Sequence, residues 1–127
     1  MNIFAEWPHN WFGLWKTSEA DSIDVPLFSE VIDAAWNPPD FENILDYLKR
    51  CPVALASGMR SEKCPHCEDH LPEPGTQRSD GVWVWPSSLA HYVEKHRVRL
   101  PDRMIMHIRS RNYSPPILPP LGGVEPS

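Results

Sequence analysis

Two cysteines and two histidines have the residue types and the spacing of a metal site. Cys64 and Cys67 are separated by two residues in the stretch CPHCEDH, and His91 and His96 are separated by four in HYVEKH. Thiolate sulfur and imidazole nitrogen are the ligands that zinc binds in tetrahedral structural sites. A two-residue gap lets one tight turn direct both sulfurs at a single ion. The sequence therefore predicts a zinc site made by these four residues.

Other interpretations of the same stretch stay open. One of the remaining histidines could replace a proposed ligand, and the candidates are His66, His70 and His107. The chain could also bind no metal. A thioredoxin-type redox pair is disfavoured, because the C-x-x-C is not placed between a strong strand and a helix in a βαβ unit. Cys51, the third cysteine, is expected to be a buried free thiol.

A catalytic role for the metal is not indicated. Two thiolates and two imidazoles fill a tetrahedral shell, whereas a catalytic zinc keeps an open position. Glu94 lies between the histidines, but H-x-x-E-x-H does not match the metalloprotease motifs, so Glu94 is expected to face solvent. The sequence also lacks a G-x-S-x-G, a phosphate loop and a G-x-G-x-x-G. We expect no catalytic residues and no enzyme activity.

The elements that must position the ligands follow the order of a ββα zinc finger. Residues 81–85, GVWVW, alternate small and large β-formers and predict a strand that Pro86 ends. Pro86-Ser87-Ser88 then starts a helix that runs through His96. The 23 residues between Cys67 and His91 exceed the roughly 12 of the DNA-binding finger. A loop near residues 70–80 would hold the extra length, and DNA recognition does not follow from the pattern.

The rest of the chain predicts further short elements. Residues 41–48 have the clearest amphipathic pattern, with Asp40 placed as the N-cap of a helix. A short helix is expected over residues 27–36, a strand over 53–56 and a last short helix around residues 104–108. Tryptophans recur every four residues at the N-terminus, where a short helix or loop should pack its indoles on the core: Trp7, Trp11 and Trp15.

These patterns predict a small α+β domain with short helices, a small β element and a ββα-like structural zinc site. Residues 1–113 are expected to form this single domain, and residues 114–127 a proline-rich tail in extended form. A chain of 127 residues fits one domain, and its 15 prolines favour irregular backbone.

Bulk properties bear on the compartment. The sequence has no apolar run of membrane-spanning length, so no membrane partner is expected. The N-terminal residues, MNIFAEWPHNWF, lack the cationic start and apolar core of a signal peptide. Three cysteines are an odd number and too few for a disulfide scaffold. We therefore expect a protein of the reducing cytoplasm, where paired cysteines more often bind metal.

Charge is divided along the chain. Residues 1–48 carry nine acidic groups against Lys16, whereas residues 95–111 carry six basic groups against Asp102. Either the two regions face each other or are simply solvated, or one of them meets an oppositely charged partner. For a basic partner we expect the contacts to come from an acidic set: Glu19, Asp21, Asp24, Glu30 and Asp33.

One stretch resembles a known pattern. SDGVWVWPSSLAHYVEKHRVRLP is similar to a signature of small uncharacterised bacterial proteins, in which D-G-x-W-x-W-P precedes L-x-H-Y-V and H-x-V-R-L-P. The match covers residues 80–101 and includes the two histidines of the C2H2-type zinc site. The resemblance implies a bacterial cytosolic protein and says nothing about a substrate.

Two binding functions remain. The first is a zinc-stabilised protein-binding module, such as an immunity protein or inhibitor of a bacterial toxin, because an acidic surface suits a basic nuclease toxin. The second is a zinc-containing transcriptional regulator that binds nucleic acid through basic residues near the C-terminus: Arg97, Arg99, Arg103, Arg109 and Arg111.

Overall fold

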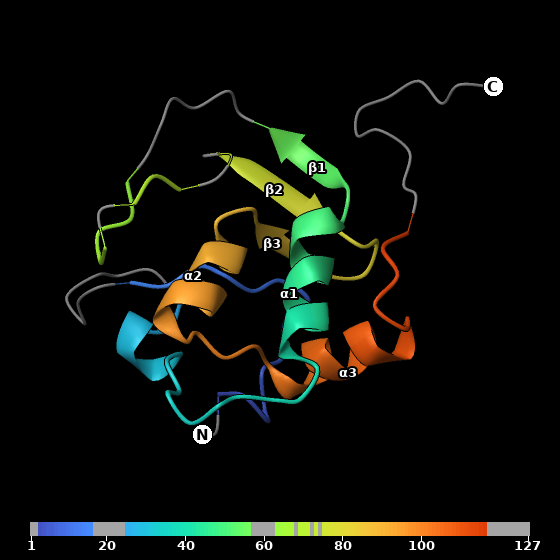
Figure 1. Cartoon of the computed structure of the whole chain (residues 1–127), viewed down its shortest axis with the longest axis horizontal. Helices are drawn as coiled ribbons and strands as arrows, with labels where there is room; N and C mark the ends of the chain where they lie inside the picture. Colours follow the sequence, from blue (N-terminus) through green and yellow to red (C-terminus); the bar gives the residue numbers. More distant parts are fainter. Residues whose placement is uncertain are drawn as a thin grey trace.

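A computed structural model describes residues 3–16, 25–56, 63–67, 69–71, 73 and 75–116. Within these residues the chain forms three α-helices and a three-stranded sheet, so the expected α+β class is confirmed (Figure 1). The elements in chain order are η1 (Phe28–Glu30), α1 (Phe41–Arg50), β1 (Val53–Ala56), β2 (Thr76–Ser79), β3 (Val84–Pro86), α2 (Leu89–His96) and α3 (Asp102–Ser110).

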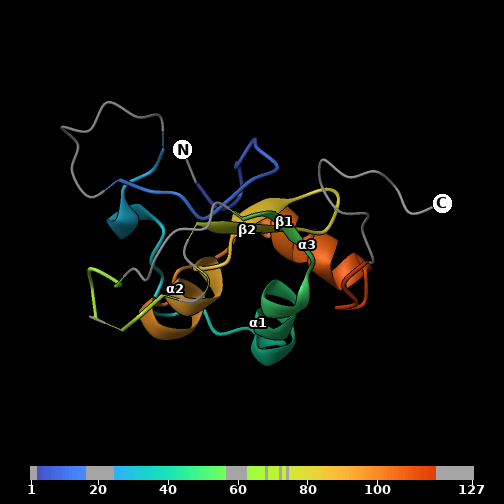
Figure 2. The same cartoon turned by 90° about the horizontal axis from the view of Figure 1, so that it is seen from above.

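The sheet is antiparallel in the order β1-β2-β3 and is covered differently on its two faces. Figure 2 shows α1 and α2 on one side of the sheet and the N-terminal segment, drawn in blue, on the other. That segment also lines the outer edge of β3, where Val84 accepts a hydrogen bond from the Phe12 N–H (3.1 Å) and donates one to the Asn10 carbonyl (3.0 Å). The N-terminal residues therefore extend the sheet.

Two tryptophans form the centre of the core. Trp83 and Trp85 are 2% and 1% exposed, and Trp85 stacks on Tyr47 with ring centroids 6.2 Å apart. The indole N–H of Trp85 donates to the Leu48 carbonyl at 3.2 Å, so its polar atom is satisfied inside the core. Burying each aromatic side chain contributes about 1.5–3 kcal/mol. These contacts fix α1 on the helix-covered face of the sheet.

A buried carboxylate organises the turn before β3. Asp80 Oδ1 accepts hydrogen bonds from the backbone N–H groups of Val82 (2.9 Å) and Trp83 (2.7 Å). Its Oδ2 accepts one from the Tyr47 hydroxyl at 2.6 Å. Gly81 has a φ of 90°, a left-handed conformation that favours glycine. The D-G-x-W sequence is therefore explained by this turn, which starts the strand and joins it to α1.

The N-terminal tryptophans pack as expected, without forming a helix. Trp7 is buried, while Trp11 and Trp15 are partly buried against the core. The predicted helix over residues 41–48 and strand over 53–56 are also confirmed. Histidine-bearing α2 and the last helix α3 lie where the sequence placed them.

The helix predicted over residues 27–36 is wrong, since only η1 is helical there. The reason is a long-range pairing: Arg99 donates its N–H to the Val31 carbonyl (2.8 Å), and Asp33 donates to the Arg97 carbonyl (3.0 Å). These bonds form an isolated antiparallel bridge at Ile32 and replace the hydrogen bonds of a helix. Pairing with a distant segment therefore overrides local propensity.

Two further expectations about the sheet need correction. The polar loop expected near residues 70–80 contains β2, whose sequence TQRS pairs with both neighbouring strands. The strand expected over 81–85 begins later, at Val84, because residues 80–83 form the Asp80 turn. It also includes Pro86, opposite Gln77.

The structure describes only the first residues of the proposed C-terminal tail. The proposed proline-rich tail begins at residue 114, and its residues 117–127 lie outside the part of the chain that the structure describes. Among the described residues, no helix has the length and apolar character required to cross a membrane.

Candidate metal centre

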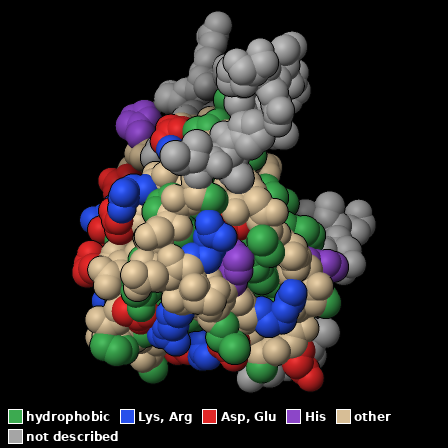
Figure 3. All heavy atoms as spheres, turned by 90° about the vertical axis from the view of Figure 1, so that its right-hand side faces the viewer, with side chains coloured by type: hydrophobic (Ala, Val, Ile, Leu, Met, Phe, Trp, Pro, Cys, Tyr) green, Lys and Arg blue, Asp and Glu red, His purple; other side chains and the backbone are tan. Residues whose placement is uncertain are grey.

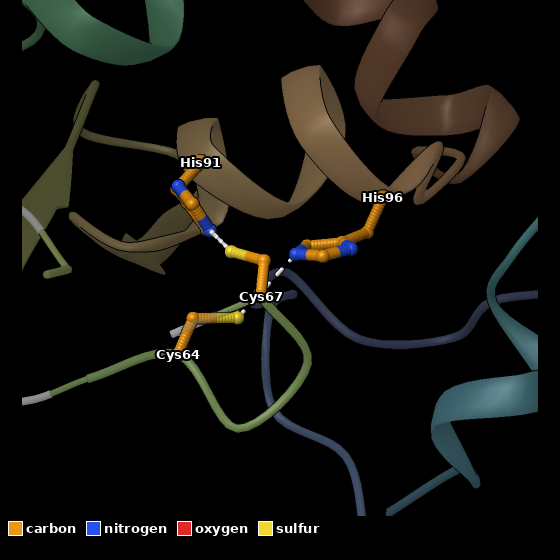
Figure 4. Close-up of side chains that lie close together, drawn as sticks. All are labelled: Cys64, Cys67, His91 and His96. Carbon is orange, nitrogen blue, oxygen red and sulfur yellow. Dashed lines mark hydrogen bonds between the residues drawn. The ribbon is translucent and has the colours of Figure 1, made fainter. Parts of the chain in front are cut away.

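The four proposed ligands lie together between one loop and one helix. One ligand atom from each of Cys64, Cys67, His91 and His96 lies within 4.8 Å of all the others. Figure 4 shows the four side chains converging from the cysteine loop and from α2. Cys64 Sγ is 3.4 Å from His96 Nε2, and Cys67 Sγ is 3.3 Å from His91 Nε2. These side chains are close enough to one another to bind a metal ion.

The two sulfur–nitrogen distances match the edge of a tetrahedral site. Bonds of about 2.3 Å to sulfur and about 2.0–2.1 Å to nitrogen give a sulfur–nitrogen edge of about 3.5 Å in a tetrahedron. The observed values of 3.4 and 3.3 Å lie near this edge. Two of the six donor–donor distances therefore agree with a tetrahedral zinc site, and all six are within 4.8 Å.

Local hydrogen bonds shape the cysteine loop. Cys64 donates its N–H to the Asp69 carbonyl at 2.8 Å, and Lys63 and His70 form an antiparallel bridge across the base of the loop. Within the turn, the His66 N–H points at Cys64 Sγ over 3.4 Å. This N–H can donate to the Cys64 sulfur and helps to hold the turn between the two cysteines.

The end of α2 places both histidines on one side. His91 lies within the helix and His96 is its last residue. Arg97 then takes a left-handed conformation with a φ of 56°, and the Val98 N–H donates to the Tyr92 carbonyl at 3.3 Å. The buried face of α2, which includes Leu89 and Val93, anchors it to the core. The helix thus holds its ligands rigidly toward the loop.

The pKa values of two ligands are shifted in opposite directions. Burial, followed by the charges of His91 and His66, lowers the pKa of His96, so this imidazole stays neutral and able to bind metal. The backbone N–H of Asp69 lowers the pKa of Cys67, but burial and the neighbouring Cys64 thiol outweigh it and leave the pKa raised. A bound cation would reverse this effect by stabilising both thiolates.

The other histidines lie elsewhere. His66 is stacked on Phe28, and His70 is exposed on the loop. His107 belongs to α3, and its Nε2 lies 3.0 Å from Asp80 Oδ2 without hydrogen-bond geometry. None of the three belongs to the group of ligand atoms that the structure brings together.

Glu94 and Cys51 also agree with their expected roles. Glu94 is exposed and lies 3.6 Å from the ammonium group of Lys49. Cys51 is a fully buried free thiol, and burial raises its pKa to about 12. Such a thiol is neither a metal ligand nor a nucleophile near neutral pH.

The acidic residues expected to bind a partner are placed only in part. Glu19, Asp21 and Asp24 lie outside the described residues. Glu30 is exposed and accepts a hydrogen bond from the Leu27 N–H at 2.9 Å. Asp33 is half-buried, since its side chain is 29% exposed and binds Arg99 at 2.9 Å.

Most of the basic residues make contacts within the chain. Arg99 binds Asp33 and Asp102, and Arg109 binds Asp40 through two hydrogen bonds of 2.8 and 3.0 Å. Arg103 donates to the backbone carbonyls of Trp7 and His9 and to the Asn10 side chain. Arg97 lies over the ring of Phe41 at 5.5 Å. The acidic and basic regions of the sequence therefore face each other in part.

Comparison with known proteins adds no relative. No protein-family model, no curated protein and no solved structure matches this chain. The resemblance to small bacterial proteins stays a prediction.

Proposed function

We propose that this protein is a small zinc-stabilised protein-binding module. The observation that carries the zinc assignment is the pair of sulfur–nitrogen distances of 3.4 and 3.3 Å between Cys64 and His96 and between Cys67 and His91. Two thiolates and two imidazoles in a tetrahedral arrangement are a donor set typical of structural zinc.

The metal in this proposal is structural, not catalytic. Four protein ligands leave no open position for water or substrate. Cys64 is 1% exposed, and the other three ligands are half-buried, so the ion would lie under the loop and against α2. Its role is to join these two segments, and the protein acts by binding and not as an enzyme.

The proposed partner is a basic protein, such as a bacterial toxin for which this chain would act as immunity protein or inhibitor. The support is the acidic N-terminal region, in which Asp33, Asp40 and Asp46 are already paired with arginines of the same chain. We therefore assign the partner contact to the acidic residues other than Asp33: Glu19, Asp21, Asp24 and Glu30. Thiolate ligands suit the reducing cytoplasm.

Nucleic-acid binding is the second candidate, and it has less support. Arg99, Arg103 and Arg109 already bind acidic groups or carbonyls of the same chain. On the face drawn in Figure 3, Lys and Arg side chains are interspersed with acidic and apolar ones. A nucleic-acid surface usually gathers its basic side chains on one face.

Charge reversal separates the two candidates. A partner captured from the native host should lose affinity and association rate at low salt when Glu19, Asp21 and Asp24 are changed to Lys. The matched control reverses Arg97 and Arg111, which should have a smaller effect. Full partner affinity after the acidic changes would contradict this assignment. Arginine-dependent binding to DNA or RNA that falls steeply with salt would favour the second candidate.

A further inference from the structure

An aromatic ring from the N-terminal part of the chain packs directly on the metal centre. Phe28 stacks on His66 with ring centroids 4.0 Å apart and an interplanar angle of 11°. It also contacts the rings of Tyr92 at 5.9 Å and His96 at 6.3 Å. His66 lies between the two cysteine ligands, whereas Tyr92 and His96 belong to α2. Phe28 therefore touches both sides of the centre at once.

Among the described residues, the segment that carries Phe28 is attached mainly through backbone pairing with Lys16 and through aromatic contacts. No residue of η1 is buried. Residues 25–30 are tied to Lys16, which donates its N–H to the Pro26 carbonyl (2.9 Å) and accepts one from the Phe28 N–H (2.9 Å). The neighbouring Trp15 in turn contacts Tyr92 at 4.8 Å and Phe28 at 5.3 Å. The two paired segments therefore both contact aromatic rings around the metal centre, one through Trp15 and the other through Phe28.

From Val31 onwards the segment is attached to the core. This residue is fully buried, and its carbonyl accepts the hydrogen bond from the Arg99 N–H. The chain after it is therefore held by contacts that include no metal ligand, namely the burial of Val31 in the core and the Asp33–Arg99 ion pair. Loss of the metal should increase the mobility of residues 25–30 more than that of residues 31–36.

We propose that metal loading controls the docking of residues 25–30 through Phe28, which is clamped between His66 and α2. The ion would join the cysteine loop to α2 and so strengthen the ring contacts that His66 makes with Tyr92 at 6.3 Å and with His96 at 5.7 Å. The proposal rests on the proposed zinc binding, and it deepens the proposed function. The docked segment carries Glu30 and follows the acidic residues assigned to the partner, so partner binding would depend on the metal.

Hydrogen exchange of the zinc-loaded protein tests the clamp directly. His66→Ala keeps all four ligands, so zinc content should be unchanged while exchange in residues 25–30 becomes about two- to tenfold faster, the equivalent of one aromatic pair. Exchange in residues 31–36 and in α1 should stay the same. The matched control is His70→Ala, an exposed histidine of the same loop with no ring contact among the described residues.

Zinc removal gives a second readout. Zinc-depleted wild-type protein should show faster hydrogen exchange in residues 25–30 than the zinc-loaded protein. Zinc depletion of the His66→Ala variant should cause little further increase in that exchange. If His66→Ala retains zinc and leaves exchange of residues 25–30 unchanged, the clamp is refuted while the zinc site stands. If the wild-type protein takes up no zinc, the proposed function itself fails.

Discussion

Asp40 shows how a residue acquires a role that its position in the sequence does not reveal. Its carboxylate makes no cap hydrogen bond to α1 and instead binds Arg109, 69 residues away, and the Tyr113 hydroxyl at 2.6 Å. The hydrogen bonds from Arg109 and then from Tyr113 outweigh the cost of burial and lower the pKa of Asp40 to about 2. The folded state therefore favours the ionised carboxylate.

This shift predicts a pH-dependent contribution to stability. Because the folded pKa lies below the unfolded value of about 3.9, the contribution is present above about pH 4 and is lost as the pH falls toward 2. Asp40→Asn should lower the free energy of unfolding by about 1 kcal/mol at pH 7, since Arg109 is partly screened by solvent. Urea denaturation of both proteins at pH 7 and between pH 2 and 4 measures the difference, which should shrink in acid.

The control for this experiment is Asp46→Asn. Asp46 pairs with Arg50 on the surface of α1, and both side chains are more than half exposed. Its loss should change stability little. Equal losses of unfolding free energy for Asp40→Asn and Asp46→Asn at pH 7 would show that the Asp40–Arg109 interaction is no stronger than the surface ion pair.

A second residue-scale prediction concerns the buried carboxylate of Asp80. Asp80→Ala removes the acceptor of the Tyr47 hydroxyl and of two backbone N–H groups, and should destabilise the fold by about 2–4 kcal/mol. Asp80→Asn keeps one carbonyl oxygen and should cost less. Thermal and urea unfolding of the two variants measure this order. Val82→Ala, at an exposed position of the same turn, is the control, and an equally large effect there would contradict the explanation.

At the scale of elements, the proposed metal would join the cysteine loop to α2, the two segments that supply its ligands. The cysteine loop is closed by the Lys63–His70 bridge and the Cys64–Asp69 hydrogen bond, whereas α2 is anchored by its buried face. A structural ion contributes its binding free energy to folding. We therefore expect the loop and the end of α2 to depend on it.

Chelation tests this dependence. Removal of zinc should lower the melting temperature and loosen the packing around the core tryptophans Trp83 and Trp85. Circular dichroism and tryptophan fluorescence during thermal unfolding measure both changes. In a Cys64→Ala/Cys67→Ala variant the chelator should have no further effect. An unchanged melt of the wild-type protein after complete zinc removal would exclude a structural role.

The elements differ in how far the sequence alone predicts them, and the reason is the range of their interactions. The amphipathic pattern of α1 depends only on residues close together in the sequence. The same holds for the spacing within the cysteine pair and within the histidine pair. By contrast, β2 has the polar sequence TQRS and becomes a strand because it pairs with β1 and β3 on either side. The helix expected over residues 27–36 is replaced by pairing with residues 97–99. Contacts between distant segments cannot be inferred from local periodicity.

At the scale of the whole molecule, some acidic residues of the N-terminal region pair with basic residues near the C-terminus. Asp33 binds Arg99 across 66 residues, and Asp40 binds Arg109 across 69. The interpretation that the acidic and basic regions face each other is therefore correct for these pairs. Of the acidic residues assigned to a partner, Glu30 has no such ion pair among the described residues, and Glu19, Asp21 and Asp24 lie outside them.

The central claim is that this chain binds one zinc ion through two sulfurs and two nitrogens. X-ray absorption at the zinc edge, on protein purified without a metal-binding tag, measures the metal and its ligands together. We expect one zinc per chain with two sulfur neighbours at about 2.3 Å and two nitrogen neighbours at about 2.0–2.1 Å. Protein without zinc, or zinc surrounded only by oxygen and nitrogen, would contradict the account.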